Sequence, residues 1–272
     1  MRFSHFFALI NVNMSKQFLF WITALGLFLA AGGWITSAYL FDKSEPITQP
    51  DVVASTTTEN IISTTNKDVA PRQKYTGQKL DYLGDYKILE KYPKEFVESN
   101  RNRLLSLVEA VTKNPDQIDN WIDIGLVKKN VDNYVGAKDV WDHTNKINPN
   151  YGLNYFNLGN LYALYLRDFK KAESNYYKAL RLDRNSVNFH LGLAEFYRDF
   201  YKEKYDLVDD VLLEGLVYVP KDANLLLNLA LYYRDTGEKA EAIKYFEKFL
   251  TAEGFSDTQA EAVKQEIEKL RQ

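Results

Sequence analysis

The 272-residue sequence predicts an all-α solenoid, in which pairs of helices stack on one another. The main observation is an internal repeat: Gly125 in NWIDIGLVKKN recurs 34 residues later as Gly159 in NYFNLGNLYAL. Two further copies, FHLGLAEFYRD and LLLNLALYYRD, carry Ala194 and Ala230 at the same position, at spacings of 35 and 36 residues. Self-similarity at this period predicts repeated helix–turn–helix units.

The first helix of each unit is indicated by large, aliphatic, small and aromatic residues at i, i+3, i+4 and i+7. In the second copy these are Tyr155, Leu158, Gly159 and Tyr162. This spacing places the four side chains on one face of a helix. The small residue lets a paired helix approach closely. The first copy has Lys128 where the others have an aromatic residue.

A second helix in each unit is predicted from a small or aliphatic residue followed four positions later by a large one. These pairs are Ala137 and Trp141, Ala172 and Tyr176, Val208 and Leu212, and Ala242 and Phe246. The extra residues of the second and third units are expected in the turns near 167–168 and 201–204, because turns tolerate insertions.

This pattern resembles the tetratricopeptide repeat family over about residues 84–254. The resemblance implies a right-handed helical solenoid of about four repeats over 118–254. It also implies a non-catalytic role, without cofactors, in which a protein or peptide partner binds in the concave groove of the solenoid.

Both ends of the predicted solenoid carry further helices. Pro93 opens a helix within 81–117 that matches the second half of a repeat, so a degenerate half-repeat is expected there. At the other end, 255–272 reads as a capping helix with Asp257 as its N-cap.

The N-terminal part of the sequence differs in composition. After a short tail of residues 1–16, residues 17–41 contain no charged residue, which exceeds the ~20 apolar residues that a transmembrane helix needs. We expect an uncleaved membrane anchor there, with a cleaved signal peptide as the main alternative and a buried core helix as a minor one. A Thr-, Ser- and Pro-rich linker is expected over 42–80.

Flanking charges predict the topology of this anchor. Arg2 and Lys16 precede it, and Asp42 and Glu45 follow it. By the positive-inside rule the N-terminus is cytoplasmic and the repeats are extracytoplasmic. If the segment is a cleaved signal, the protein is secreted instead.

Composition argues against most catalytic and nucleic-acid functions. The chain has no cysteine, three histidines and a net charge of −3. Thiolate metal sites are excluded, and a nucleic-acid or small-molecule partner is not expected. His190 occupies a packing position and is expected in the core, and a surface or inter-repeat position is expected for His143. TGEK at 236–239 is read as a turn between helices, not as a phosphate-binding loop.

A partner-binding stripe is predicted on the first helices, one, five and eight residues after each large packing residue. It comprises Ile122, Leu126, Lys129, Phe156, Asn160, Ala163, Leu191, Glu195, Arg198, Leu227, Leu231 and Arg234, with Asn157 and Asn228 beside it. The residues expected to contact the partner are Phe156, Asn157, Asn160, Glu195, Arg198, Asn228 and Arg234. The partner is expected to have apolar anchors and acidic groups for the two arginines.

Two other interpretations of the stripe stay open. In one, Leu227 and Leu231 merely pack and the arginines pair with Asp199, Asp235 or Glu195. In the other, the segment Tyr75–Leu89 folds back and fills the groove. The predicted function is a membrane-anchored scaffold for protein or peptide partners. The alternative is a structural subunit or spacer of a cell-envelope secretion, pilus or cell-wall assembly.

Overall fold

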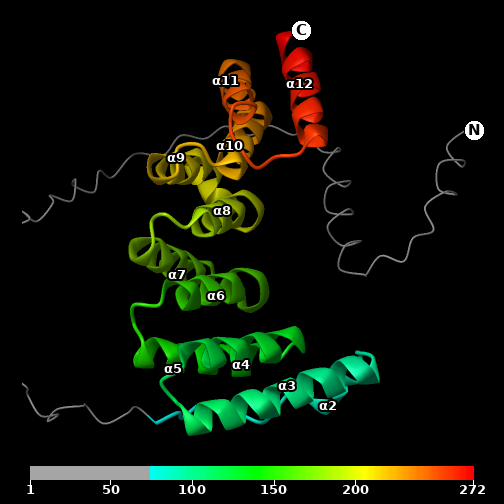
Figure 1. Ribbon diagram of the computed structural model, residues 1–272, viewed down its shortest axis with the longest axis vertical. Coiled ribbons are helices and arrows are strands. Elements are labelled where there is room, and N and C mark those ends of the chain that lie inside the picture. The colour runs from blue at the N-terminus through cyan, green and yellow to red at the C-terminus, as the bar shows by residue number, and fades with distance from the viewer. Residues whose placement is uncertain (1–73) are drawn as a thin grey trace, which may run out of the picture. The chain divides into compact units, whose positions relative to one another are not determined.

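The computed structural model describes residues 74–272, which contain eleven α-helices and no β-strand (Figure 1). The helices are α2 Tyr86–Leu89, α3 Lys94–Lys113, α4 Ile118–Asn130, α5 Tyr134–Ile147, α6 Gly152–Leu161, α7 Phe169–Leu182, α8 Val187–Glu195, α9 Val208–Tyr218, α10 Ala223–Thr236, α11 Lys239–Phe249 and α12 Asp257–Arg271. The anchor expected over residues 17–41 lies outside this part of the chain. None of the helices within 74–272 combines the length and the apolar character that a membrane span requires.

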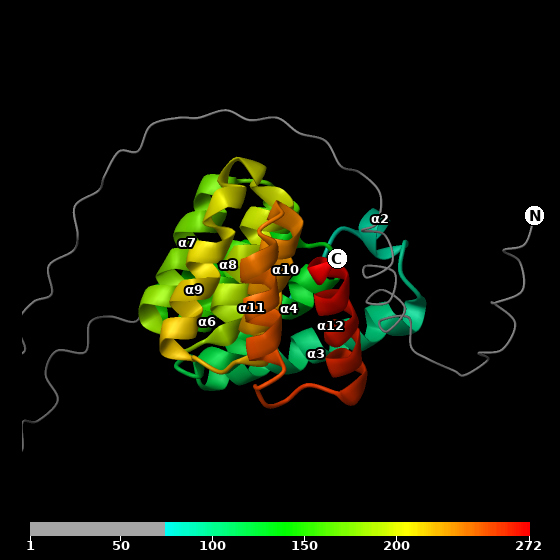
Figure 2. The same cartoon turned by 90° about the horizontal axis from the view of Figure 1, so that it is seen from above.

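The predicted all-α solenoid is confirmed. Contacts join α4 to α5, α6 to α7, α8 to α9 and α10 to α11, and each pair also contacts the next one. Figure 1 shows the pairs stacked one above another from α4 to α11. Seen from above, the second helices α7 and α9 lie on one side of the stack, and the first helices α4 and α10 lie toward the other (Figure 2).

Short non-α segments hold the extra residues of the second and third units. A π-helical turn, Tyr162–Leu166, extends α6, and another, Phe196–Phe200, extends α8. In the latter the Tyr201 amide donates to the Phe196 carbonyl at 2.9 Å, five residues back rather than four. A 3₁₀ segment, Lys202–Leu207, then leads into α9. The additional residues therefore lie in and beside the two predicted turns.

Trp141 connects the first two helix pairs. Its side chain is 1% exposed, and its Nε1 donates to the Ile122 carbonyl of α4 at 3.1 Å. The Asn154 side chain of α6 donates to the Trp141 carbonyl at 2.6 Å. The indole belongs to the larger apolar core, which continues through all later pairs to Val263 and Ile267 of α12.

The terminal helices differ from expectation in one detail. α3 begins after Pro93, as the sequence predicts. The N-cap of α12 is Ser256 and not Asp257, because Ser256 and Gln259 form a reciprocal capping box. At the end of α10, Gly237 adopts a φ of 86°, a left-handed conformation that favours glycine, so the predicted turn at 236–239 is present.

Candidate functional site

The predicted binding stripe lies on the first helices of the four pairs, and part of it is inaccessible. α6 and α10 both contact α8, so the stripe continues across the second, third and fourth pairs. Ile122 is only 4% exposed and Ala163 is fully buried, and both belong to the core. These two stripe positions are therefore packing residues and not contact residues for a partner.

Phe156 is also engaged in packing between pairs. Its ring stacks on Phe189 at a centroid distance of 5.0 Å and meets the Tyr176 ring edge-on at 5.8 Å. A Cβ on Gly192 would lie 2.4 Å from the Phe156 ring. Phe156 is half-buried, so only part of its ring is accessible to a partner.

The two asparagines predicted on α6 are half-buried. The Asn160 side-chain oxygen accepts a hydrogen bond from the Tyr176 hydroxyl at 2.7 Å. None of the hydrogen bonds within residues 74–272 uses the amide nitrogen of Asn160 or the side chain of Asn157. Both groups can donate to an extended peptide backbone.

Arg198 and Asn228 are brought together from the third and fourth pairs. The Arg198 guanidinium donates to the Asn228 side-chain oxygen at 3.1 Å and pairs with Asp199 at 3.2 Å. Asn228 in turn donates to the Asn224 carbonyl at 2.9 Å. The guanidinium is therefore oriented from two sides while its side chain stays about one-third exposed.

Glu195 and Arg234 flank this contact along the stripe. Desolvation raises the pKa of the Glu195 carboxyl, Arg198 opposes the rise and Asp199 adds to it. Arg234 pairs with Asp235 at 2.7 Å and lies 3.7 Å from Glu266 of α12. The expected alternative, in which the two arginines pair with their neighbouring aspartates, is thus present in the structure. These pairs are partly exposed, and pairs of this kind are individually weak.

The segment Tyr75–Leu89 does fold back, but onto a different surface. The Gln78 amide donates to Asp139 of α5 at 2.9 Å, and the Asn133 side chain donates to the Leu83 carbonyl at 3.1 Å. The Tyr75 ring contacts the Trp121 ring at 5.9 Å. None of these partners belongs to the predicted stripe. The expected linker boundary at residue 80 therefore falls inside a packed segment.

Lys128 is the residue whose role the sequence analysis missed. It is fully buried, and its ammonium donates to the carbonyls of Lys79 at 3.2 Å and Tyr82 at 2.6 Å. Burial lowers its pKa to about 8, against the attraction of Asp81 and Asp139. These hydrogen bonds hold the segment Tyr75–Leu89 against the first helix pair. A lysine at an aromatic position of the repeat was the signal that could have revealed this.

The two histidines within residues 74–272 are buried. His190 is fully buried, as predicted, and its Nε2 lies 2.9 Å from the Arg184 carbonyl. His143 is buried against the rings of Trp121 and Tyr75, and burial lowers its pKa, with Lys146 adding to the effect. Within residues 74–272 no group of three His, Asp or Glu side chains is arranged to hold a metal ion.

Comparisons with known proteins agree with this architecture. The tetratricopeptide repeat family model matches residues 154–186 and 223–254. No curated protein matches the sequence.

Several solved structures are similar in fold. MamA is 16% identical, with 58% of this chain and 88% of that chain covered and a TM-score of 0.46. PilW, a type IV pilus biogenesis factor, is 16% identical, with 65% and 81% covered and a TM-score of 0.48. PilF of Pseudomonas aeruginosa is 23% identical, with 56% and 67% covered and a TM-score of 0.45. The two matched segments are tetratricopeptide repeats, and each contains one helix pair, α6/α7 and α10/α11.

Proposed function

We propose that this protein is a non-catalytic scaffold that binds a protein or peptide partner along the first helices of its repeats. The helix pairs α4/α5 and α8/α9 are taken as two further repeats beside those that the family model matches. In this proposal α3 is a degenerate half-repeat and α12 is the capping helix. Residues 17–41 anchor the chain in a membrane, and the repeats face away from the cytoplasm.

The observation that carries the proposal is the contact between Arg198 and Asn228. It joins two consecutive repeats, and Asn157 and Asn160 lie on α6, the first helix of the preceding pair. A guanidinium that is already oriented needs little further ordering to bind a carboxylate. A bound acidic group replaces Asp199 as the partner of Arg198 or shares the guanidinium with it.

The remaining donors favour an extended partner segment. Asn157 and the Asn160 amide nitrogen can bond its backbone, as amides do for extended chains. The half-buried side chains of Phe156, Leu227 and Leu231 supply apolar contacts. The partner is therefore an extended, mainly apolar segment with an acidic residue opposite Arg198.

The test starts with crosslinking in native membranes and identification of the partner by mass spectrometry. The partner's affinity is then measured for the wild type, for Asn160→Ala with Arg198→Ala, and for a control on the outer helix α7, Asn175→Ala with Arg181→Ala. We expect at least about a tenfold loss for the first variant and no change for the control. Equal affinities of correctly folded variants would move the site away from the first helices.

Topology is tested separately. Protease is added to cells whose outer layer has been permeabilised while the inner membrane stays intact. Digestion of the repeats is expected. Protection until the inner membrane is lysed would show that the repeats are cytoplasmic, which leaves the binding proposal standing.

A further inference from the structure

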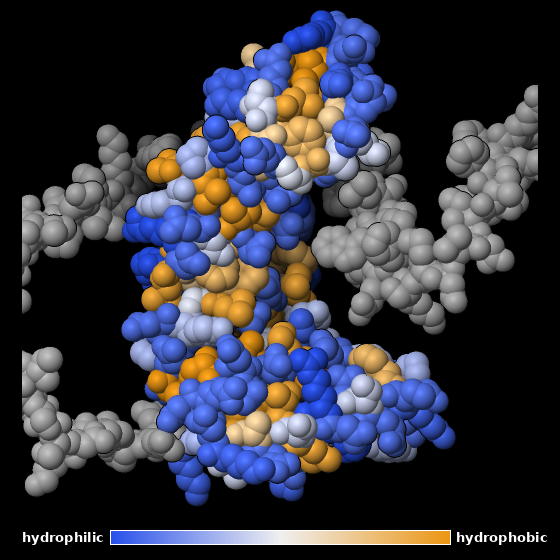
Figure 3. Space-filling model, in the orientation of Figure 1, coloured by the Kyte–Doolittle hydropathy of each residue, from blue (hydrophilic) through white to orange (hydrophobic). Residues whose placement is uncertain are grey.

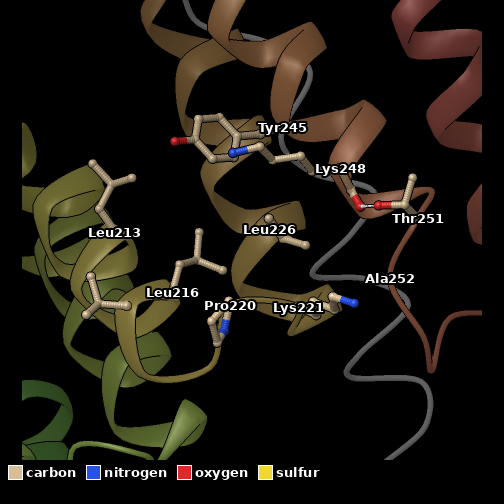
Figure 4. A pocket seen from close by; sticks show the side chains of 10 residues that line it. Leu213, Leu216, Pro220, Lys221, Leu226, Tyr245, Lys248, Thr251 and Ala252 are labelled. Atoms are coloured by element: carbon tan, nitrogen blue, oxygen red, sulfur yellow. Dashed lines mark hydrogen bonds between the residues drawn. The ribbon is translucent and has the colours of Figure 1, made fainter.

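A second surface is hollowed between the second helices α9 and α11, away from the first-helix face. It is a pocket of about 430 Å³ over the start of α10, and Figure 4 shows Leu213 and Leu216 on one wall and Tyr245 and Lys248 on the other. Leu226 lies between the walls. We call this pocket the outer groove.

The outer groove is open because no pair of long side chains bridges the junction between α9 and α11. At the preceding junction, between α7 and α9, Arg184 donates to the Tyr218 hydroxyl at 2.6 Å and its guanidinium lies 5.7 Å from that ring. The repeat spacing places Pro220 and Ala252 at the corresponding positions of the next junction, and both line the pocket. Neither side chain can reach across, so the apolar floor stays accessible.

Apolar surface alone does not single out this place. Figure 3 shows apolar patches at several heights of the stack, each interrupted by polar side chains. The outer groove differs because it is concave and its lining includes a strongly exposed hydrophobic residue. Val217, at 73% exposure, has the largest exposed fraction of the exposed large hydrophobic residues in the described chain.

The charges at the outer groove are of one sign. Lys221 and Lys248 both line it and are exposed, and neither forms an ion pair with any residue of the described chain. The Lys248 ammonium lies 4.7 Å from the centre of the Tyr245 ring, which holds it over the apolar wall. Glu247, the acidic residue nearest to Lys248 along α11, forms an ion pair with Arg271 at 2.7 Å.

We infer that the outer groove is a second binding site, which takes a partner-protein segment with adjacent apolar side chains flanked by acidic residues. Apolar side chains of the segment cover Leu213, Leu216 and Val217. Its carboxylates pair with Lys221 and Lys248 at the rim. This site is separate from the first-helix surface and can be occupied at the same time, since none of the residues that line the groove belongs to the predicted stripe.

A selection experiment tests the chemistry. Random ten-residue peptides displayed on phage are selected on the full-length chain in detergent and counter-selected on Val217→Glu with Lys221→Glu and Lys248→Glu. All three positions are exposed, so the variant is expected to fold, and circular dichroism checks it. The control, Val135→Glu with Lys170→Glu and Lys239→Glu, makes the same changes at exposed positions elsewhere.

The expected result is enrichment of acidic, apolar peptides whose affinity falls about tenfold or more in the groove variant and stays unchanged in the control. Enrichment of neutral or basic peptides, or failure to enrich any peptide that discriminates the two variants, overturns the proposal. Replacing Asp and Glu of a selected peptide by Asn and Gln should reproduce most of the loss.

Crosslinking identifies the occupant. A photo-reactive benzoylphenylalanine is placed at position 217, and the full chain is irradiated with a selected peptide. A crosslink to the peptide supports the proposal. A crosslink to a second copy of the chain, or to residues 1–73 of the same chain, shows that the groove is already occupied and overturns it. Unchanged peptide binding in Asn160→Ala with Arg198→Ala separates this site from the proposed function.

Discussion

The Trp141 indole lies directly against Gly125, so that a Cβ at position 125 would be 2.1 Å from the indole nitrogen. The glycine on α4 is therefore required by the tryptophan on α5. The sequence predicts both as packing residues of the first repeat, and the structure shows that they pack against each other. Their closeness makes the first repeat sensitive to a change of a single methyl group.

Gly125→Ala is expected to destabilise the protein by about 1–3 kcal/mol, because the indole is held by its bond to Ile122 and cannot move freely. Chemical denaturation measures the loss. The control is Gly84→Ala, where the nearest neighbour of the new Cβ would be 3.6 Å away. Equal effects of the two substitutions would contradict the packing argument.

Trp141→Ala is expected to cost ~3–5 kcal/mol, the range for truncation of a large buried side chain. It also leaves the Ile122 carbonyl without its indole donor. Because contacts in a solenoid are local, hydrogen exchange should rise mainly in α4 to α7. In the double variant Gly125→Ala with Trp141→Ala the two losses of stability should not add, because the indole that would clash with the new Cβ is absent. A uniform loss of protection along the chain would argue against a solenoid of local contacts.

Lys128→Met is expected to release the segment Tyr75–Leu89 while the repeats stay folded. The substitution removes the donor to the Lys79 and Tyr82 carbonyls, and an unpaired buried carbonyl costs about 1–3 kcal/mol. Hydrogen exchange of amides 75–89 should speed up, with little change in α8 to α11. Lys129→Met serves as the control, since Lys129 makes no described hydrogen bond to this segment. Undisturbed protection of residues 75–89 would show that Lys128 does not fasten them.

Stability should depend on pH above 8 in two opposed steps. The pKa of Lys128 is lowered to about 8 from an ordinary 10.5, so the unfolded chain holds more protons between these values and stability rises with pH. Burial raises the pKa values of Tyr75, Tyr176 and Tyr232 above 10, so above pH 10 the unfolded chain loses protons that the folded chain keeps. Stability should then fall.

Urea denaturation at pH 7, 9 and 11 measures both steps. In Lys128→Met the rise between pH 7 and 9 should be smaller, and the fall toward pH 11 should remain. If the fall were absent in wild type, the buried tyrosines would not be responsible for alkaline destabilisation.

Ser256→Ala should destabilise α12 by about 1 kcal/mol, because it removes the side-chain acceptor of the Gln259 amide. Asp257→Ala changes the first turn of the helix without removing this cap, and its effect should be smaller. Thermal denaturation of both variants compares them. A larger effect at Asp257 would restore the N-cap assignment that the sequence suggests.

The sequence by itself determines the repeated part of this protein. The spacing of Gly125, Gly159, Ala194 and Ala230 predicts the stacked helix pairs, and the extra residues lie in or beside the predicted turns near 167–168 and 201–204. Such prediction works because a helical period reports which face of a helix is buried, and each unit buries the same face against its neighbours.

Only the tertiary structure decided which polar side chains are bound by neighbouring residues. It placed Lys128 in the core and made Ser256 the N-cap of α12. It also buried Ile122 within the predicted stripe and left the outer groove open beside Pro220. A helical period cannot show these outcomes, because they depend on partners that lie far away in the chain and on whether a neighbouring side chain is long enough to reach.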